Sequence, residues 1–376
     1  MFPLMKMGKE DNGPPSRSNS HRQVHTSIHD VGSDVSLASV DVPPLSRRNS
    51  RQSSHHDHEL PRSATYHPLA PHVLLLFIPA SIFGVLARLG LEALVTYDGQ
   101  SIFPLAYVQG LGCFVMGFSL EMKESMGNFY PPLYTALTTG FCGSLTTFSS
   151  WQLDVFSSWL NSEDTHRSGL QDFIDGLGKT VFTLVISITS LSFGGYIARI
   201  IHPYLPTIQP PTKKVRYAIS AMCILFYVAA LLAYFLLPTS YRHQATAALL
   251  FAFPGTLTRY LLSTLLNPLL IGFPLGTFAA NSTGTSLLAA FHVIQSIASH
   301  PISPNMCSLV QGLSDGYCGC LTTVSTFAAE IRVLRRWEQL RYAWMSWGVG
   351  QLLILIIMGP SLLSGNVHKQ QMCSFD

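Results

Sequence analysis

The sequence predicts an all-α membrane protein, with nine transmembrane helices arranged as two inverted four-helix repeats joined by a single linker helix. Hydrophobic residues make up 48% of its 376 residues and charged residues only 11%, whereas soluble proteins carry roughly 25% charged residues. Nine apolar runs approach the ~20 residues that a helix needs to cross a bilayer. A twelve-residue motif also occurs twice, which indicates an internal duplication.

The apolar runs follow one another through short connections marked by Pro, Gly or Asn. They occupy residues 72–95, 102–121, 132–158, 174–200, 217–237, 244–265, 272–298, 306–331 and 342–363. The domains predicted from them are a tail (1–71), a first four-helix unit (72–201), a linker with its own helix (202–243), a second four-helix unit (244–363) and a C-terminal tail (364–376).

The N-terminal tail differs from the rest of the chain in its charge. Residues 1–71 hold 15 of the 43 Lys, Arg, Asp and Glu residues and few aromatic residues. Such a segment buries too little apolar surface to order itself, so we expect a disordered cytosolic tail. Arg47 and Arg48 place a kinase-like motif at Ser50 within it. The net charge of +3 without a dense basic stripe argues against a nucleic-acid partner.

The positions of Lys and Arg predict the orientation, because cytosolic loops of membrane proteins are enriched in these residues. The connections after the fourth and eighth runs carry Arg199, Lys213, Lys214 and Arg216, and Arg332, Arg335, Arg336 and Arg341, respectively. The connections on the other side hold one such residue or none. This bias predicts a cytosolic N-terminus and an extracellular C-terminus.

The duplicated motif defines the repeat. Residues 140–151 read GFCGSLTTFSSW and residues 316–327 read GYCGCLTTVSTF, so seven of twelve positions are identical. Arg88 and Arg259 also lie at matching places, as do Gln109 and Asn281. Two four-helix units separated by one extra crossing point in opposite directions. Inverted repeats of this kind are common in membrane transport proteins, with binding sites near the membrane midplane.

The motif predicts a break in the third helix of each unit, because Gly weakens helices and Thr hydroxyls compete for backbone partners. Broken backbone at membrane depth survives only when it is buried in protein or lines a polar cavity. The freed carbonyls are candidate cation ligands, and the half-helix N-termini favour anions. The alternative is a helix-packing interface of small residues.

Several polar residues fall within apolar runs. Asn281 needs hydrogen-bond partners there, which makes it a functional candidate. Tyr342 and Ser346 lie one helical turn apart and could form a line of hydroxyls, or serve as an interfacial anchor and a packing residue. Arg88 and Arg259 lie toward the predicted cytosolic ends of their helices, where snorkelling to lipid headgroups is the alternative role. We expect no Lys or Arg deep within a span.

At these residues the sequence resembles the fluoride exporter family, the bacterial CrcB/Fluc channels and the eukaryotic FEX proteins. The family pattern is G-x-x-G-x-L-T-T-F-S-T-F on a broken third helix, with N-x-x-G on the second helix and an Arg on the first. The resemblance covers residues 72–363 and includes both copies. It implies a narrow, passive, fluoride-selective channel of two fused units. Neutral donors and aromatic ring edges suit such a pore, since they can replace the hydration shell of an anion without trapping it.

The resemblance also implies roles for individual residues. Each family pore takes one aromatic position from each unit, so we expect one working pore with Phe148 and Phe327, and one degenerate pore. The residues assigned to the working pore are Asn281, Phe148, Phe327, Thr322, Thr323, Ser325, Tyr342 and Ser346. Those assigned to the degenerate pore are Gln109, Trp151 and Val324, and the supporting residues are Arg88, Arg259 and Glu330.

By the same resemblance, a structural sodium ion is expected at backbone carbonyls of the two helix breaks. The matching positions are Gly143, Ser144, Gly319 and Cys320. No sodium coupling is expected. The resemblance further implies a monomer, built as an internal pseudo-dimer in the lipid bilayer of the plasma membrane.

Two other functions remain open at this point. A secondary transporter for another small ion could use the same inverted repeats, with Asp154 and Glu330 as proton or cation sites. A non-transporting membrane scaffold could recruit partners through its long tail. The sequence contains neither a GxxxxGK[ST] phosphate-binding loop nor an HExxH motif, so we expect neither an enzyme nor an ATP-driven pump.

Overall fold

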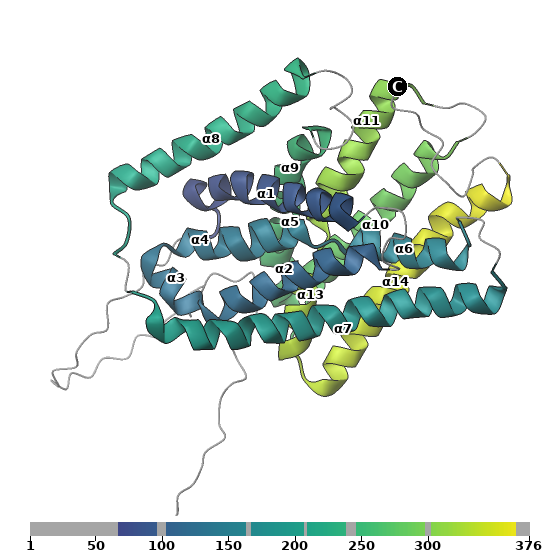
Figure 1. Cartoon of the computed structure of the whole chain (residues 1–376), viewed down its shortest axis with the longest axis horizontal. Coiled ribbons are helices and arrows are strands. Elements are labelled where there is room, and N and C mark those ends of the chain that lie inside the picture. The colour runs from purple at the N-terminus through teal and green to yellow at the C-terminus, as the bar shows by residue number, and fades with distance from the viewer. Residues whose placement is uncertain are drawn as a thin grey trace, which may run out of the picture. The chain divides into compact units, whose positions relative to one another are not determined.

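The computed structural model describes residues 67–95, 103–162, 167–206, 209–237, 246–297 and 302–365, all within one compact unit. The predicted cytosolic tail up to residue 66, including the motif at Ser50, and the end of the chain from residue 366 lie outside the described residues. The regular elements are helices, as predicted (Figure 1).

The two predicted units show the same order of elements, except that α3 of the first unit has no counterpart in the second. The first contains α1 (Pro71–Val95), α2 (Pro104–Glu121), α3 (Lys123–Phe129), α4 (Pro131–Thr135), the π-helical η1 (Ala136–Cys142), α5 (Gly143–Leu145), α6 (Phe148–Trp159) and α7 (Gly169–Ile201). The second contains α9 (Ala247–Leu266), α10 (Leu275–Gln295), α11 (Pro304–Gly312), the π-helical η6 (Leu313–Cys318), α12 (Gly319–Leu321), α13 (Ser325–Val333) and α14 (Arg336–Leu363). Helix α8 (Lys213–Leu236) connects them.

Both predicted helix breaks are confirmed, and both fall at the Thr-Thr pairs. Thr146 has φ −90° and ψ 145°, and Thr322 has φ −92° and ψ 155°, so both backbones are extended where a helix would continue. A π-helical segment precedes each break. Such wide turns are rare and often occur at functional sites.

Five described helices are long and apolar enough to cross a membrane, and a sixth crossing results if the bent pair α2–α3 counts as one. The five are Pro71–Val95, Gly169–Tyr204, Lys213–Leu236, Ala247–Leu269 and Arg336–Leu363. The broken segments α4–α6 and α11–α13 consist of pieces that are each shorter than a crossing. The helix count of nine therefore remains a prediction.

Helix α8 lies at the edge of the helices in Figure 1 and contacts α1. Only Cys223 and Ala230 of its residues are buried, and Ala230 packs against Ile78 and Ile82 of α1. Its remaining surface is mainly apolar and exposed, as expected for a helix that faces lipid.

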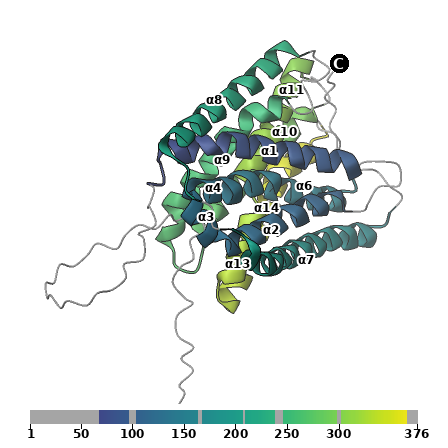
Figure 2. The same ribbon diagram turned by 60° about the vertical axis from the view of Figure 1, so that its left-hand side comes forward.

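Small residues allow close packing elsewhere. Helices α2 and α7 lie side by side in both ribbon views (Figures 1 and 2). A Cβ atom at Gly117 would collide with the Leu191 carbonyl, and one at Gly194 with the Phe114 carbonyl. Glycine at these two positions therefore lets the helix backbones touch, which is typical of membrane helix pairs.

Candidate functional site

The two helix breaks meet through their threonine hydroxyls. Thr146 Oγ1 lies 3.2 Å from Thr323 Oγ1, and Thr147 Oγ1 lies 3.1 Å from Thr322 Oγ1. All four side chains are buried. Each pair joins the first threonine of one motif to the second threonine of the other, so the contact follows the duplication.

Each of these breaks is capped by the opposite unit. The amides of Phe148 and Ser149 both donate to Thr322 Oγ1 at 3.2 Å. The amides of Val324 and Ser325 donate to Thr146 Oγ1 at 3.3 and 3.1 Å. In continuous helices these amides would donate to carbonyls four residues earlier. The hydroxyls thus satisfy the orphan donors at the N-termini of α6 and α13.

Asn281 and its counterpart Gln109 bind the breaks differently. Asn281 Oδ1 accepts from the Thr323 amide at 2.8 Å, and its Nδ2 donates to the Thr323 carbonyl at 3.2 Å. Gln109 Nε2 donates to the Thr147 carbonyl at 2.7 Å. Its Oε1 has no hydrogen-bond partner within the described part of the chain. Asn281 therefore fixes its break through two bonds, whereas Gln109 uses one.

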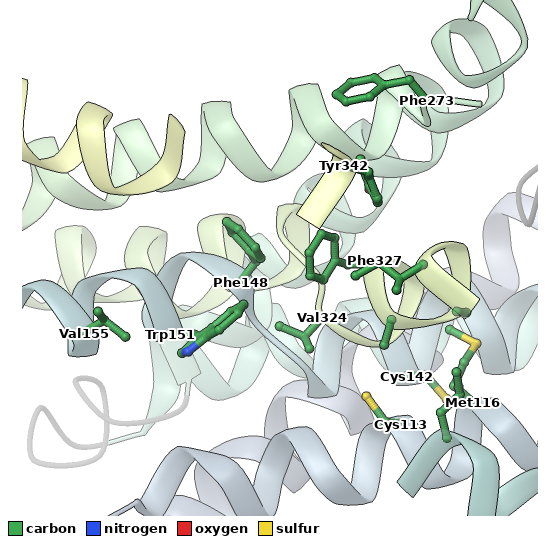
Figure 3. Close-up of a cluster of buried hydrophobic side chains, with 14 residues drawn as sticks. Cys113, Met116, Cys142, Phe148, Trp151, Val155, Phe273, Val324, Phe327 and Tyr342 are labelled. Atoms are coloured by element: carbon green, nitrogen blue, oxygen red, sulfur yellow. The ribbon is translucent and has the colours of Figure 1, made fainter. Parts of the chain in front are cut away.

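The predicted aromatic pair does come together. The rings of Phe148 and Phe327 lie 5.5 Å apart at 68°, and Phe327 lies 5.2 Å from the Tyr342 ring. Figure 3 shows these three rings in succession, within a buried cluster that also contains Trp151 and Val324. Phe148 further packs against Trp151 at 5.4 Å and 88°. The four aromatic-position residues thus form one layer beside the breaks.

Glu330 extends this layer with a buried carboxylate that is 3% exposed. The Tyr342 hydroxyl donates to it at 2.7 Å, Thr277 Oγ1 at 2.6 Å and Asn267 Nδ2 at 3.4 Å. No ion pair to Glu330 occurs among the residues that the structure describes. Neutral donors alone therefore hold this carboxylate.

The matching acid of the first unit, Asp154, has a different environment. Its side chain is 35% exposed and lies 2.7 Å from Lys179 Nζ. Lys179 also lies 3.9 Å from Asp175, which pairs with Arg167 at 3.1 Å. A network of charges thus surrounds the acid of the first unit.

The helix starts show which residues correspond in α7 and α14. The N-cap amide of Ser168 donates to Gln171 at 2.7 Å, and that of Arg335 donates to Glu338 at 3.1 Å. When the helices are aligned on these caps, Asp175 stands at the position of Tyr342. The tyrosine hydroxyl of the second unit is therefore replaced by an aspartate carboxylate in the first.

The expectation that no Arg lies deep in a span is wrong. Arg88 and Arg259 are each only 2% exposed, so they do not snorkel to a surface. Arg259 Nη2 donates to the Thr139 carbonyl at 2.8 Å, and Arg88 Nη2 donates to the Asp315 carbonyl. Thr139 and Asp315 occupy matching positions, each directly before the motif. Each arginine therefore binds the π-helical segment of the other unit, because a guanidinium carries enough donors to satisfy buried carbonyls.

The arginines also bear on the predicted sodium site. Arg259 Nε donates to the Cys320 carbonyl at 2.7 Å. A Cβ at Gly143 would collide with the guanidinium of Arg259, and one at Gly319 with that of Arg88. Two cationic groups thus lie against the breaks, and close like charges repel. Of the four predicted carbonyl ligands, that of Cys320 already accepts a hydrogen bond from Arg259, and the sodium ion remains a prediction.

The sequence identified Phe148, Phe327, Tyr342 and Glu330, which the structure brings together. It also identified Asn281, which binds the backbone of the break at Thr323. Thr322, Thr323 and Ser325 lie beside them at the breaks, and Ser346 lies one turn beyond Tyr342 on α14. Sequence reasoning missed the capping role of Thr146. The signal was present, since the Thr-Thr pair occurs in both motifs.

Two broken helical segments that meet at a buried polar centre, in a duplicated set of apolar helices, define a membrane protein of the kind that carries ions or small solutes. A family model described as CrcB-like protein, Camphor Resistance (CrcB), matches residues 75–195 and again residues 246–359. The chain belongs to this CrcB-like family, and the double match confirms the internal repeat.

Curated relatives agree with this assignment. The chain is 32% identical to fluoride export protein 1 of Neurospora crassa over 339 residues, which cover 74% of this chain and 64% of that protein. It is 32% identical to fluoride export protein 1 of Candida albicans, over 80% of this chain and 81% of that one. A fluoride-specific ion channel of Dehalococcoides mccartyi is 25% identical over 34% of this chain and 93% of its own length. No solved structure matches the chain significantly.

Proposed function

We propose that this chain is a fluoride-selective passive channel, which exports fluoride from the cytosol through one working pathway. The names of its relatives in N. crassa, C. albicans and D. mccartyi support fluoride as the ion. The observation that carries the single pathway is the contrast between the two matched amides. Asn281 clamps its break through two hydrogen bonds, whereas Gln109 makes one and leaves a buried oxygen without a partner in the described chain.

The proposed pathway runs between α6, α10 and α14, which contact one another. Its groups are mostly neutral hydrogen-bond donors: the Ser346 hydroxyl, the Asn281 amide and the hydroxyls at the breaks. The Tyr342 hydroxyl lies beside them and donates its one hydrogen to Glu330. A bare ion cannot enter a low-dielectric interior unless its hydration shell is replaced. One hydrogen bond to a charged group contributes roughly 1.5–3 kcal/mol, so several donors in succession are needed. Such a line of donors can replace the hydration shell of an anion at successive points.

The matched pathway of the first unit, along α2 and α7, lacks this line of donors. Val324 replaces a phenylalanine in its aromatic layer, and Asp175 replaces the tyrosine hydroxyl. The Asp154–Lys179 ion pair lies next to Asp175. An ionised carboxylate has no hydrogen to donate to an anion, and here it replaces a hydroxyl group. This pathway is therefore the degenerate one in the proposal.

The proposed architecture has nine crossings, in two inverted units within one monomer of the plasma membrane. That number is the sum of the five unbroken spans, the two helices α2 and α10, and the two broken segments. Basic residues favour a cytosolic N-terminus. Cys307, near the start of α11, is disulfide-bonded. Disulfides persist in oxidising compartments, which supports an extracellular position for the N-terminal end of α11.

Coupled transport is the second candidate, because Glu330 is a buried carboxylate without a cationic partner in the described chain. Intramembrane carboxylates often carry protons in transporters. In the channel proposal, Glu330 instead anchors the Tyr342 hydroxyl and Thr277. The two proposals differ in whether a proton gradient drives fluoride movement.

Fluoride efflux from liposomes that hold the purified full chain tests the proposal. A fluoride electrode follows efflux after valinomycin sets the membrane potential, and parallel liposomes contain chloride. We expect fast fluoride efflux that requires valinomycin, with no chloride efflux. Folded and inserted protein that releases no fluoride, or releases chloride equally, would contradict the proposed function.

A further inference from the structure

A pair of glutamines continues the proposed pathway one helical turn beyond the aromatic layer. Gln152 follows Phe148 by four residues, so the two side chains share a face of α6. A Cβ at Gly350 would lie 3.0 Å from Gln152 Oε1, which places the glutamine side chain against α14 one turn beyond Ser346. Gln351 is the next residue along α14. Gln152 and Gln351 are 0% and 7% exposed.

The hydrogen bonds of this pair fix the direction of the Gln152 amide. Gln351 Nε2 donates to Gln152 Oε1 at 2.7 Å and to the Gln152 backbone carbonyl at 3.0 Å. Both hydrogens of Gln351 are therefore used, and the side-chain oxygen of Gln152 is held toward Gln351. The Nε2 group of Gln152 consequently points away from it, with both of its hydrogens free for another acceptor.

This Nε2 group is a buried donor without a partner among the described residues, and so is Ser346 Oγ. Leaving a buried polar atom unpaired costs about 1–3 kcal/mol, so such atoms in a folded protein call for an explanation. An acceptor that is absent from the protein itself supplies one. Gln351 Oε1 is also unpaired, but it is an acceptor and would bind water rather than an anion.

The matched positions of the other pathway contain no amide. Gln152 corresponds to Ala328 by the motif repeat, and Gln351 corresponds to Leu184 when α7 and α14 are aligned on their caps. Both replacements are apolar and belong to the buried cluster or pack against it. The glutamine pair therefore occurs only beside the pathway that contains Asn281.

We propose that Gln152 Nε2 and Ser346 Oγ bind a fluoride ion at a further site on the outward side of the aromatic layer. Gln351 is a positioning residue, which holds the Gln152 amide with its donor toward the ion. This inference rests on the proposed function. A small anion that accepts hydrogen bonds satisfies both donors at once, which neither a cation nor an apolar solute can do.

Fluoride flux measured against fluoride concentration tests this site, with the full chain in liposomes. Gln152→Met keeps the approximate length of the side chain but removes the donor. We expect a rise of about tenfold in the half-saturating fluoride concentration, the effect of one lost hydrogen bond to an ion. Gln351→Leu keeps the Gln152 donor but removes the hydrogen bonds that orient it. We therefore expect a smaller rise in the half-saturating fluoride concentration, of about threefold. Leu184→Ala, at the matched position of the other unit, should leave the curve unchanged.

Variants that elute as folded protein on size exclusion but keep the wild-type curve would overturn the site and assign the Gln152 donor to a water molecule only. Gln152→Asn, which retains the donor on a shorter chain, provides a second folded variant if Gln152→Met fails to insert. It should shift the same curve, and an unshifted curve contradicts the site. Failure of wild-type efflux would instead contradict the proposed function, so the two failures are distinguishable.

Discussion

A single buried arginine side chain links the two units. Arg259 donates hydrogen bonds to the Cys320 carbonyl of its own unit and to the Thr139 carbonyl of the other. A guanidinium can do this because its donors form a rigid planar fork. A lysine ammonium offers the same charge as a point, and it cannot span two carbonyls in the same way.

We therefore predict that Arg259→Lys lowers the free energy of unfolding by about 2–4 kcal/mol, since it leaves one or two buried carbonyls unsatisfied. Thermal unfolding in detergent, followed by the loss of the monodisperse peak, measures this. Arg167→Lys serves as a control, because its ion pairs with Asp172 and Asp175 are partly exposed. It should change stability by less than about 1 kcal/mol. Equal stability of Arg259→Lys and wild type would contradict the cross-link.

The broken helices depend on hydroxyls from the opposite unit. Thr322 Oγ1 accepts from two amides at the start of α6, and Thr146 Oγ1 does so for α13. The N-terminus of a helix carries partial positive charge, and losing a cap typically costs about 1 kcal/mol. Because each unit caps the broken helix of the other, the two breaks depend on each other.

Thr322→Val removes the hydroxyl and keeps the shape, so we predict a loss of about 1–3 kcal/mol of stability. Thr322→Ser retains the hydroxyl and should lose less than Thr322→Val. Unfolding temperatures of the two purified variants measure the difference. The capping account fails if valine and serine at this position give the same temperature.

The whole chain functions as one asymmetric pair of units in the proposal. Both units keep the fold-defining motif, but only the pathway between α6, α10 and α14 combines Asn281 with a Phe148–Phe327 pair. A passive pathway depends only on the electrochemical gradient of fluoride, whereas a coupled transporter moves fluoride with a second ion.

We predict that fluoride efflux from liposomes is unchanged, within about twofold, when an inward or outward proton gradient is imposed at constant membrane potential. The same rate is expected when potassium replaces sodium on both sides. A pH electrode in the same liposome suspension reports any proton movement. Fluoride accumulation against its own gradient, driven by protons, would favour the coupled transporter with Glu330 as its proton site.

Composition and the repeated motif predicted much of this arrangement. Gly and Thr at membrane depth predicted the breaks, and a lone amide in an apolar run predicted that Asn281 has hydrogen-bond partners there. The depth of Arg88 and Arg259 was not predictable in this way, because their partners lie on the other unit. Helices α7 and α14 also begin earlier than the apolar runs, since Gln171 and Glu338 cap polar first turns that hydropathy excludes.

The comparison of Asn281→Ala with Gln109→Ala tests the single working pathway most directly. Both variants truncate a matched amide, and both are measured as valinomycin-dependent fluoride efflux from liposomes with equal amounts of folded protein. We predict that Asn281→Ala reduces efflux by at least about tenfold, the effect of one lost hydrogen bond to an ion and a loosened break. Gln109→Ala should retain most of the wild-type rate. Efflux that survives Asn281→Ala but disappears in Gln109→Ala would contradict the account and assign conduction to the other pathway.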